Sequence, residues 1–187
     1  MTIPILRSGG RILVDQLLAQ GVERLTCVPG ESFLAVLDAL HDAAIDVLVC
    51  RSEGGAGMMA EAYGKLTNRP GVCFVTRGPG ATNASPALHI ARQDSTPMVL
   101  FVGQVGRDMR EREAFQEVDY RAVFGSIAKW VVEIDAPGRL PELTARLPRR
   151  HAGAARAGGG GAAGRHADRG GRRGRRATRR CGRNASR

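Results

Sequence analysis

The sequence predicts an α/β fold in which a parallel β-sheet carries helices on both faces. Short apolar runs of strand length alternate along the chain with segments whose apolar residues recur at helical spacing. Four of these runs end in glycine, proline or polar residues. Strands that alternate with helices of this length pair in parallel through right-handed crossovers, so these four exits would gather at one edge of the sheet.

The first three helices are predicted from apolar stripes. The first spans residues 8–20 and ends at Gly21, and the second runs from about 32 to 40 with Ser32 near its N-cap. A third helix follows Glu53. Its predicted buried stripe consists of Met58, Met59, Ala62, Tyr63 and Leu66.

The other elements continue the alternation. Strands are expected at 25–28, 45–50, 72–76, 98–102 and 127–134, and further helices at 83–92 and 137–146. Residues 107–121 are charged with a few apolar anchors, and they form either a loop that covers the site edge, a partner surface, or a solvated connection. Glu61 and Lys65, four residues apart, are interpreted as a surface pair, and His89 as a residue of a helix face rather than a base.

Charge divides the chain into a domain, residues 1–146, and an Arg/Gly/Ala-rich tail, residues 147–187. The tail holds thirteen of the 28 basic and one of the 18 acidic residues, which leaves the domain with a net charge of −2. The basic character of the whole chain therefore gives no support for nucleic-acid binding by the domain. The tail cannot bury a core and is expected to be disordered.

The cysteines and the apolar runs indicate a cytoplasmic protein. Cys27, Cys50, Cys73 and Cys181 show no C-x-x-C spacing, and three of them lie in or beside apolar runs, as buried reduced thiols do. The first ten residues contain no apolar run long enough for a signal peptide, and no stretch approaches the roughly 20 residues of a membrane span. We therefore expect no membrane association.

The most informative stretch is Val75-Thr76-Arg77-Gly78-Pro79-Gly80-Ala81-Thr82-Asn83, where an apolar strand ends and a helix of small residues begins. Two glycines around a proline allow a tight exit and bring main-chain N–H groups close to a ligand. Thr82 and Asn83 add polar side chains. From spacing alone, an ordinary strand-to-helix turn is equally compatible, because neither a dinucleotide fingerprint nor a P-loop is present.

Several motifs in order resemble those of one family. They are VPGE at 28–31, RSEGGAGMMAEAYG at 51–64, GPGATN at 78–83, DSTPMVLFVGQV at 94–105 and AFQEVD at 114–119. Residues 8–146 thus resemble the N-terminal, pyrimidine-binding domain of thiamine diphosphate-dependent enzymes of the acetolactate synthase-like group. Gly54 and Glu31 stand where acetolactate synthases commonly carry glutamine and glycine, so the resemblance extends to the wider group of carboligases and decarboxylases of 2-oxo acids.

The resemblance implies a catalytic role for Glu53. The matching glutamate hydrogen-bonds N1′ of the aminopyrimidine and favours the imino tautomer that takes the proton from thiazolium C2, which requires a carboxyl group in a dry site. On position alone, Glu53 could equally be an acid that stabilises a helix N-terminus. The resemblance also implies that Pro29, Gly30, Glu31, Gly78, Pro79, Gly80, Thr82 and Asn83 line the cofactor pocket, and that Phe115 and Gln116 face the substrate.

The family resemblance further implies a second domain, which binds Mg²⁺ and the cofactor's diphosphate through a Gly-Asp-Gly motif and an asparagine. Such a motif does not occur in these 187 residues, and the residues named above imply no protein-built metal site. The site of the family forms between subunits, so we expect a homo-oligomer or a separately encoded diphosphate-binding partner, and no activity from the chain alone. Intact members can also bind FAD, and some serve branched-chain amino acid biosynthesis.

Alternatives stay open at this level for both the tail and the domain. The tail can be the product of a frame shift near Arg146 in a GC-rich gene, or a genuine arginine-rich arm that binds RNA or another polyanion. It lacks the aromatic residues that usually stack on bases, which disfavours the second reading. The domain itself can belong to a truncated enzyme, to a split enzyme, or to a non-catalytic regulatory remnant.

Overall fold

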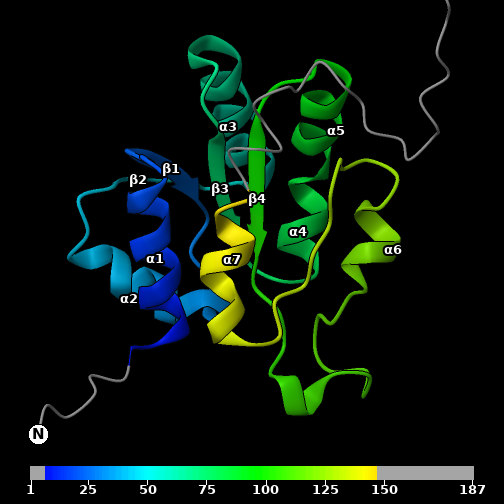
Figure 1. The fold of residues 1–187 in the computed structure, drawn as a ribbon. Coiled ribbons are helices and arrows are strands. Elements are labelled where there is room, and N and C mark those ends of the chain that lie inside the picture. The colour runs from blue at the N-terminus through cyan, green and yellow to red at the C-terminus, as the bar shows by residue number, and fades with distance from the viewer. Residues whose placement is uncertain (1–6, 147–187) are drawn as a thin grey trace, which may run out of the picture.

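The computed structural model describes residues 7–146 and contains a four-stranded parallel sheet with the order β2-β1-β3-β4 (Figure 1). The strands are β1 (Arg24–Cys27), β2 (Asp46–Val49), β3 (Gly71–Val75) and β4 (Met98–Val102). The helices are α1 (Gly9–Ala19), α2 (Leu34–His41), α3 (Glu53–Thr67), α4 (Pro79–Asn83), α5 (Ser85–Gln93), α6 (Tyr120–Phe124) and α7 (Leu140–Thr144). The predictions for the tail, residues 147–187, lie outside the described part of the chain.

Two apolar cores lie on opposite faces of the sheet. Alternate residues of β3 separate them, with Phe74 in one core and Cys73 and Val75 in the other. The first core collects apolar residues from α1, α2 and α7, and the second collects the alanines of α3, α4 and α5. Helices therefore cover both faces of the sheet, which confirms the predicted fold class (Figure 1).

The predicted buried stripe of the third helix is wrong. Met58, Met59, Ala62 and Leu66 lie on the exposed side of α3, and Leu66 is 86% exposed. The buried residues are small because α3 packs very closely on its neighbours: a Cβ at Gly57 would lie 2.8 Å from Ala87 Cβ, and one at Gly64 would lie 2.2 Å from Pro97 O. The larger apolar side chains are consequently displaced to the outside.

The interpretation of Glu61 as a surface residue is also wrong. Glu61 is buried, and Thr96 Oγ1 donates a hydrogen bond to its Oε1 at 2.9 Å. The expected partner, Lys65, lies 3.6 Å from the same oxygen and forms a shorter contact, 2.5 Å, with Asp94. Glu61 faces inward because α3 lies so close to the segment that leads into β4.

The fifth predicted strand, residues 127–134, is not a strand. Ile127 and Ala128 close a turn on the carbonyl of Phe124, and residues 130–136 are extended without ladder pairing among the described residues. Val131 packs against the second core and Ile134 against the first. The apolar run therefore reflects burial on both sides of the sheet edge and not pairing with β4.

Two helix predictions need smaller corrections. The helix expected at 83–92 is divided at Ala84 into α4 and α5, and α4 already begins at Pro79 inside the Gly-Pro-Gly turn. Ser32 lies in a 3₁₀ turn (Glu31–Phe33), and its side chain makes no capping hydrogen bond. By contrast, Ser8 Oγ accepts a hydrogen bond from Arg11 N and caps α1.

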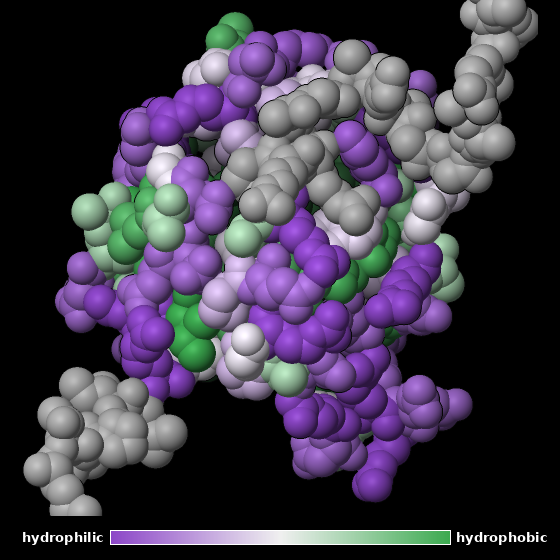
Figure 2. All heavy atoms as spheres, in the orientation of Figure 1, coloured by the Kyte–Doolittle hydropathy of each residue, from purple (hydrophilic) through white to green (hydrophobic). Residues whose placement is uncertain are grey.

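Hydrophilic residues cover much of the surface seen in Figure 2. The segment after β4, residues 107–113, contributes a hydrophilic projection at the lower right of this view (Figures 1 and 2). Within residues 7–146, no helix has the length and apolar character needed to cross a membrane. Cys27, Cys50 and Cys73 are free thiols.

Candidate functional site

The exits of β1 and β3 meet at the carboxyl edge of the sheet. A Cβ at Gly30 would lie 2.5 Å from Thr76 Cβ, so only glycine permits this approach of the two backbones. The hydroxyls of Ser32 and Thr76 lie 2.8 Å apart and join the same two segments. The structure thus brings together the two motifs that the sequence placed at strand exits.

Glu53 begins α3 directly beside this contact. Its side chain is half-buried, and its Oε2 accepts a hydrogen bond from Asn83 Nδ2 at 3.3 Å. A Cβ at Gly80 would lie 3.4 Å from Glu53 Oε1 and 2.8 Å from Thr76 Cγ2. The carboxylate therefore has an oriented hydrogen-bond donor on one side and the bare backbone of a glycine on the other.

The Gly-Pro-Gly turn has a backbone that its sequence explains. Gly78 has a φ of +58°, in the region that favours glycine, and Pro79 is the first residue of α4. The Thr82 hydroxyl lies 3.3 Å from Gly78 O and 3.1 Å from Pro79 O and donates back to this turn. Only the oxygen lone pairs of Thr82 are then left to accept a hydrogen bond from a ligand.

Residues 104–119, called the site loop below, lie beside the turn. Arg77 Nε donates to Phe115 O at 3.0 Å, and the Arg77 guanidinium also pairs with the Glu31 carboxylate. The N–H of Gly78 donates to Tyr120 Oη at 2.9 Å, where α6 begins. The predicted substrate-side pair, Phe115 and Gln116, is thus adjacent to the predicted cofactor turn.

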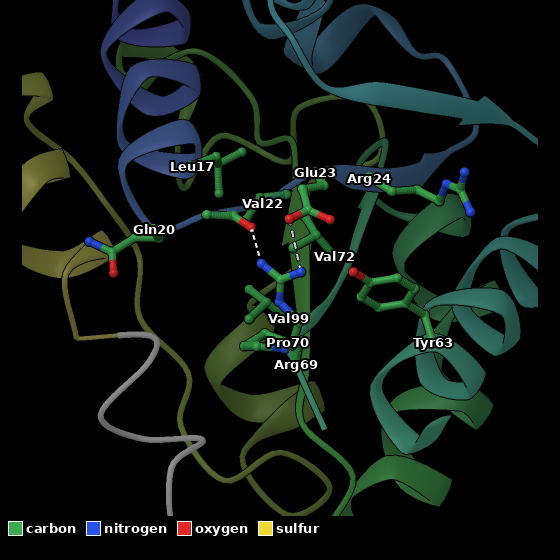
Figure 3. Close-up of a pocket in the computed structure, with 11 residues that line it drawn as sticks. Leu17, Gln20, Val22, Glu23, Arg24, Tyr63, Arg69, Pro70, Val72 and Val99 are labelled. Atoms are coloured by element: carbon green, nitrogen blue, oxygen red, sulfur yellow. Dashed lines mark hydrogen bonds and ion pairs between the residues drawn. The ribbon is translucent and has the colours of Figure 1, made fainter. Parts of the chain in front are cut away.

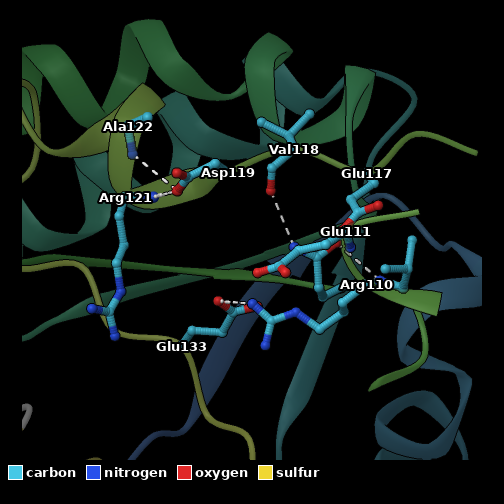
Figure 4. Close-up of polar contacts among 10 residues, drawn as sticks. Arg110, Glu111, Glu117, Val118, Asp119, Arg121, Ala122 and Glu133 are labelled. Atoms are coloured by element: carbon cyan, nitrogen blue, oxygen red, sulfur yellow. Dashed lines mark hydrogen bonds and ion pairs between the residues drawn. The ribbon is translucent and has the colours of Figure 1, made fainter. Parts of the chain in front are cut away.

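The site loop has its own polar framework (Figure 4). Gln104 Nε2, just after β4, donates to Val118 O at 3.1 Å. Glu117 accepts hydrogen bonds from Glu111 N and Ala114 N at 2.7 and 3.1 Å, and these bonds hold its pKa below the usual range. Hydrogen bonds therefore hold the site loop beside the site edge, and all three interpretations of its charge pattern stay predictions.

Sequence reasoning missed Tyr120, and it placed Arg77 and Gln104 at strand exits without assigning them a role. Arg77 and Gln104 each lie two residues beyond a strand, after β3 and β4, and polar side chains at this edge of a parallel sheet commonly face a site. Tyr120 gave no such signal, because its contact with Gly78 spans 42 residues of sequence. Burial raises the pKa of the Tyr120 phenol, so its hydroxyl stays protonated at neutral pH.

Two hollows lie beside the sheet, and the larger one is also lined by Ser32, Gln104 and Tyr120. One, about 70 Å³, lies at the opposite edge of the sheet between α1, β1 and α3, where Arg69 donates to Gly21 O and Glu23 at 2.9 Å each (Figure 3). The other, about 510 Å³, follows β4 and residues 130–135 on both sides of the sheet edge. Neither is lined by Glu53 or by the Gly78–Gly80 turn. Among residues 7–146, no group of three His, Cys, Asp or Glu side chains could hold a metal ion.

A parallel sheet whose carboxyl edge presents an oriented carboxylate and closely packed glycines defines an α/β ligand-binding domain. The sequence model described as "Thiamine pyrophosphate enzyme, N-terminal TPP binding domain" matches residues 7–123, and the chain belongs to this family.

Acetolactate synthases are among the similar proteins. The chain is 40% identical over 136 residues to the mitochondrial acetolactate synthase catalytic subunit of Aspergillus candidus, a match that covers 72% of this chain and 20% of that protein. It is also 40% identical over 134 residues to the acetolactate synthase of Bacillus subtilis, covering 72% and 24%. With the Escherichia coli acetolactate synthase isozyme 2 large subunit, identity is 38% over 138 residues, covering 74% and 25%. The chain thus spans about a fifth to a quarter of the length of these relatives.

Proposed function

We propose that this domain is the pyrimidine-binding part of a thiamine diphosphate-dependent carboligase or decarboxylase that acts on small 2-oxo acids. The observation that carries the proposal is the position of Glu53. Its carboxylate stands at the carboxyl edge of the sheet, oriented by Asn83 and adjacent to the backbone of Gly80. A carboxyl group held in this way can share a proton with a ring nitrogen of a bound heterocycle.

The surrounding residues fit an aminopyrimidine. Gly80 packs closely beside Glu53, since a Cβ there would lie 3.4 Å from Glu53 Oε1 and 2.8 Å from Thr76 Cγ2, so the Gly-Pro-Gly turn and the carboxylate would both contact the ring. The close contact of Gly30 with Thr76 holds the two strand exits together at the floor of the site. The proposed cofactor-binding residues are Pro29, Gly30, Glu31, Glu53, Gly78, Pro79, Gly80, Thr82 and Asn83.

Bound thiamine diphosphate would supply a nucleophilic carbon that adds to the carbonyl of a 2-oxo acid and accepts electrons when carbon dioxide leaves. The chain contributes proton handling and positioning. Glu53 holds a proton for the ring nitrogen, and the amide of Asn83 fixes the carboxyl orientation. Phe115 and Gln116 border the substrate side of the turn.

We further propose that catalysis requires a second domain, from the same or another chain, that holds Mg²⁺ and the diphosphate. Glu53 is only half-buried in the described residues, whereas proton sharing with a weak ring base calls for a drier site. The exposed apolar residues of α3, Met58, Met59 and Leu66, provide a surface that such a domain or a second copy could cover. Residues 7–146 alone would then show no turnover, and FAD binding, where it occurs, would involve the completed enzyme.

Saturation-transfer NMR on the full chain with thiamine diphosphate tests the proposal. We expect the pyrimidine protons to receive the strongest saturation, and Glu53→Gln to weaken binding about tenfold through loss of one charge-assisted hydrogen bond. The matched control is Glu23→Gln, which removes an exposed carboxylate paired with Arg69 at the opposite edge of the sheet and should leave binding unchanged. Saturation that avoids the pyrimidine ring, or equal loss in both variants, would contradict the proposal.

A further inference from the structure

Arg77 lies where three segments of the site edge meet. Its side chain is only 12% exposed, although it follows β3 at the surface edge of the sheet. The guanidinium bonds the Glu31 carboxylate after β1 and, through Nε, the Phe115 carbonyl in the site loop. One planar guanidinium can serve two acceptors at fixed angles, which a lysine ammonium on a flexible stem cannot reproduce.

The next residue fixes the same part of the loop. A Cβ at Gly78 would lie 2.8 Å from Gln116 Cβ and 2.9 Å from Gln116 O, so loop and turn are in direct backbone contact. Gln116 itself has a φ of +64°, a conformation that costs a non-glycine residue free energy unless its surroundings hold it. The hydrogen bond from Gly78 N to Tyr120 Oη joins the turn to the residue that directly follows the site loop.

These contacts hold an exposed aromatic side chain in place. Phe115 is 76% exposed, yet its carbonyl is bonded to a mostly buried arginine. A large apolar side chain gains nothing for the stability of the isolated domain by facing solvent. Packing within residues 7–146 therefore does not explain why the backbone of Phe115 is held in place.

We propose that Arg77 is a positioning residue, which fixes the backbone of Phe115 and Gln116 against the Gly78–Gly80 turn and thereby sets the substrate side relative to the cofactor side. The part of the proposal that concerns substrate rests on the proposed function. The part that concerns the loop does not. The Glu31 pair is secondary, because Glu31 lies on an exposed rim where ion pairs contribute little.

Hydrogen exchange of the full chain, without cofactor, tests the anchoring. Arg77→Lys keeps a cation near Glu31 but loses the directed Phe115 bond, and we expect amides of the site loop to exchange about tenfold faster. Glu31→Gln keeps the Phe115 bond and should change this exchange by less than about twofold. The control Arg24→Met removes an exposed ion pair with Asp46 on the far side of the sheet and should leave the loop unchanged.

The outcome distinguishes anchoring from general stability. Faster exchange confined to the site loop, with an unchanged urea midpoint, supports the proposal. Unchanged exchange in Arg77→Lys, or an equal increase in Glu31→Gln, would overturn it whatever the reaction of the enzyme.

A second readout addresses the substrate. In the enzyme assembled with a diphosphate-binding domain, Arg77→Lys should raise KM for pyruvate about tenfold with a much smaller change in kcat, while affinity for thiamine diphosphate stays the same. If Arg77→Lys lowers the affinity for thiamine diphosphate as well as raising KM for pyruvate, Arg77 belongs to the cofactor pocket and its positioning role is overturned. If the wild-type enzyme assembled with the diphosphate-binding domain shows no thiamine diphosphate binding at all, the proposed function fails, and the exchange experiment still decides whether Arg77 anchors the loop.

Discussion

Substituting Gly30 by alanine should destabilise the domain at the site while leaving its cores intact. The added Cβ would lie 2.5 Å from Thr76 Cβ and 2.8 Å from Thr76 Oγ1, closer than non-bonded carbon atoms can approach. Gly30 has φ −157° and ψ 154°, so alanine adopts this backbone without strain and the whole cost comes from the clash. Overpacking of this kind costs about 1 to 3 kcal/mol, and movement of the strand exits would also stretch the 2.8 Å contact between Ser32 and Thr76.

Urea unfolding measures this cost, provided that the m value stays constant so that the midpoint reports stability. Gly138→Ala is the matched control, because a Cβ there would have no atom within 4 Å, and we expect a change of at most about 0.5 kcal/mol. Adding Thr76→Gly to Gly30→Ala should recover part of the loss by removing the opposing Cβ. If Gly30→Ala were as neutral as Gly138→Ala, the close approach of the β1 and β3 exits would be refuted.

Further predictions concern the core and the surface. Burial raises the pKa of the Cys73 thiol from 9.0 to about 11, so the unfolded chain ionises first and the free energy of unfolding should fall by about 2 to 3 kcal/mol between pH 9 and 11. Urea titrations should show a smaller fall in Cys73→Ala, because Tyr120 and Cys27, whose pKa values burial also raises, remain. Thr96→Val removes the donor to the buried Glu61 and should cost about 1 to 3 kcal/mol by the same assay, and a neutral result would contradict that bond. Met59→Lys with Leu66→Lys should reduce self-association in sedimentation velocity without lowering stability, and association that persists would exclude this face of α3.

The alternation of apolar runs was sufficient to predict the sheet, because fully buried parallel strands such as β3 read as continuous apolar segments. It failed at residues 127–134, where Val131 and Ile134 are partly buried against different faces of the sheet without pairing. Hydrophobicity reports burial, and only tertiary structure decides whether a buried extended segment also joins a ladder.

The predicted buried stripe of α3 was wrong for a related reason. Large apolar residues were expected in the stripe, but the contact is made by Gly57, Ala60 and Gly64, whose small size allows the helix to lie close to α5 and the sheet. Small residues at helical spacing carried the relevant signal. The large residues Met59 and Leu66 instead mark a face that the described residues leave exposed.

The sequence predicted those parts of the candidate site that consist of short continuous motifs. Glu53 and the Gly-Pro-Gly turn were each recognisable in a few consecutive residues, and the structure places them side by side. Their roles toward a cofactor stay predictions. The contacts of Arg77 with Phe115 and of Gly78 with Tyr120 join residues about 40 positions apart and could not be inferred from spacing.

The central claim is that Glu53 promotes proton removal from the cofactor. Proton NMR in D₂O can follow hydrogen–deuterium exchange at C2 of thiamine diphosphate bound to the full chain assembled with a diphosphate-binding domain. The account predicts exchange faster than that of the free cofactor, with at least about tenfold loss in Glu53→Gln and no loss in Glu23→Gln. Exchange in Glu53→Gln that equals the wild-type rate would contradict it.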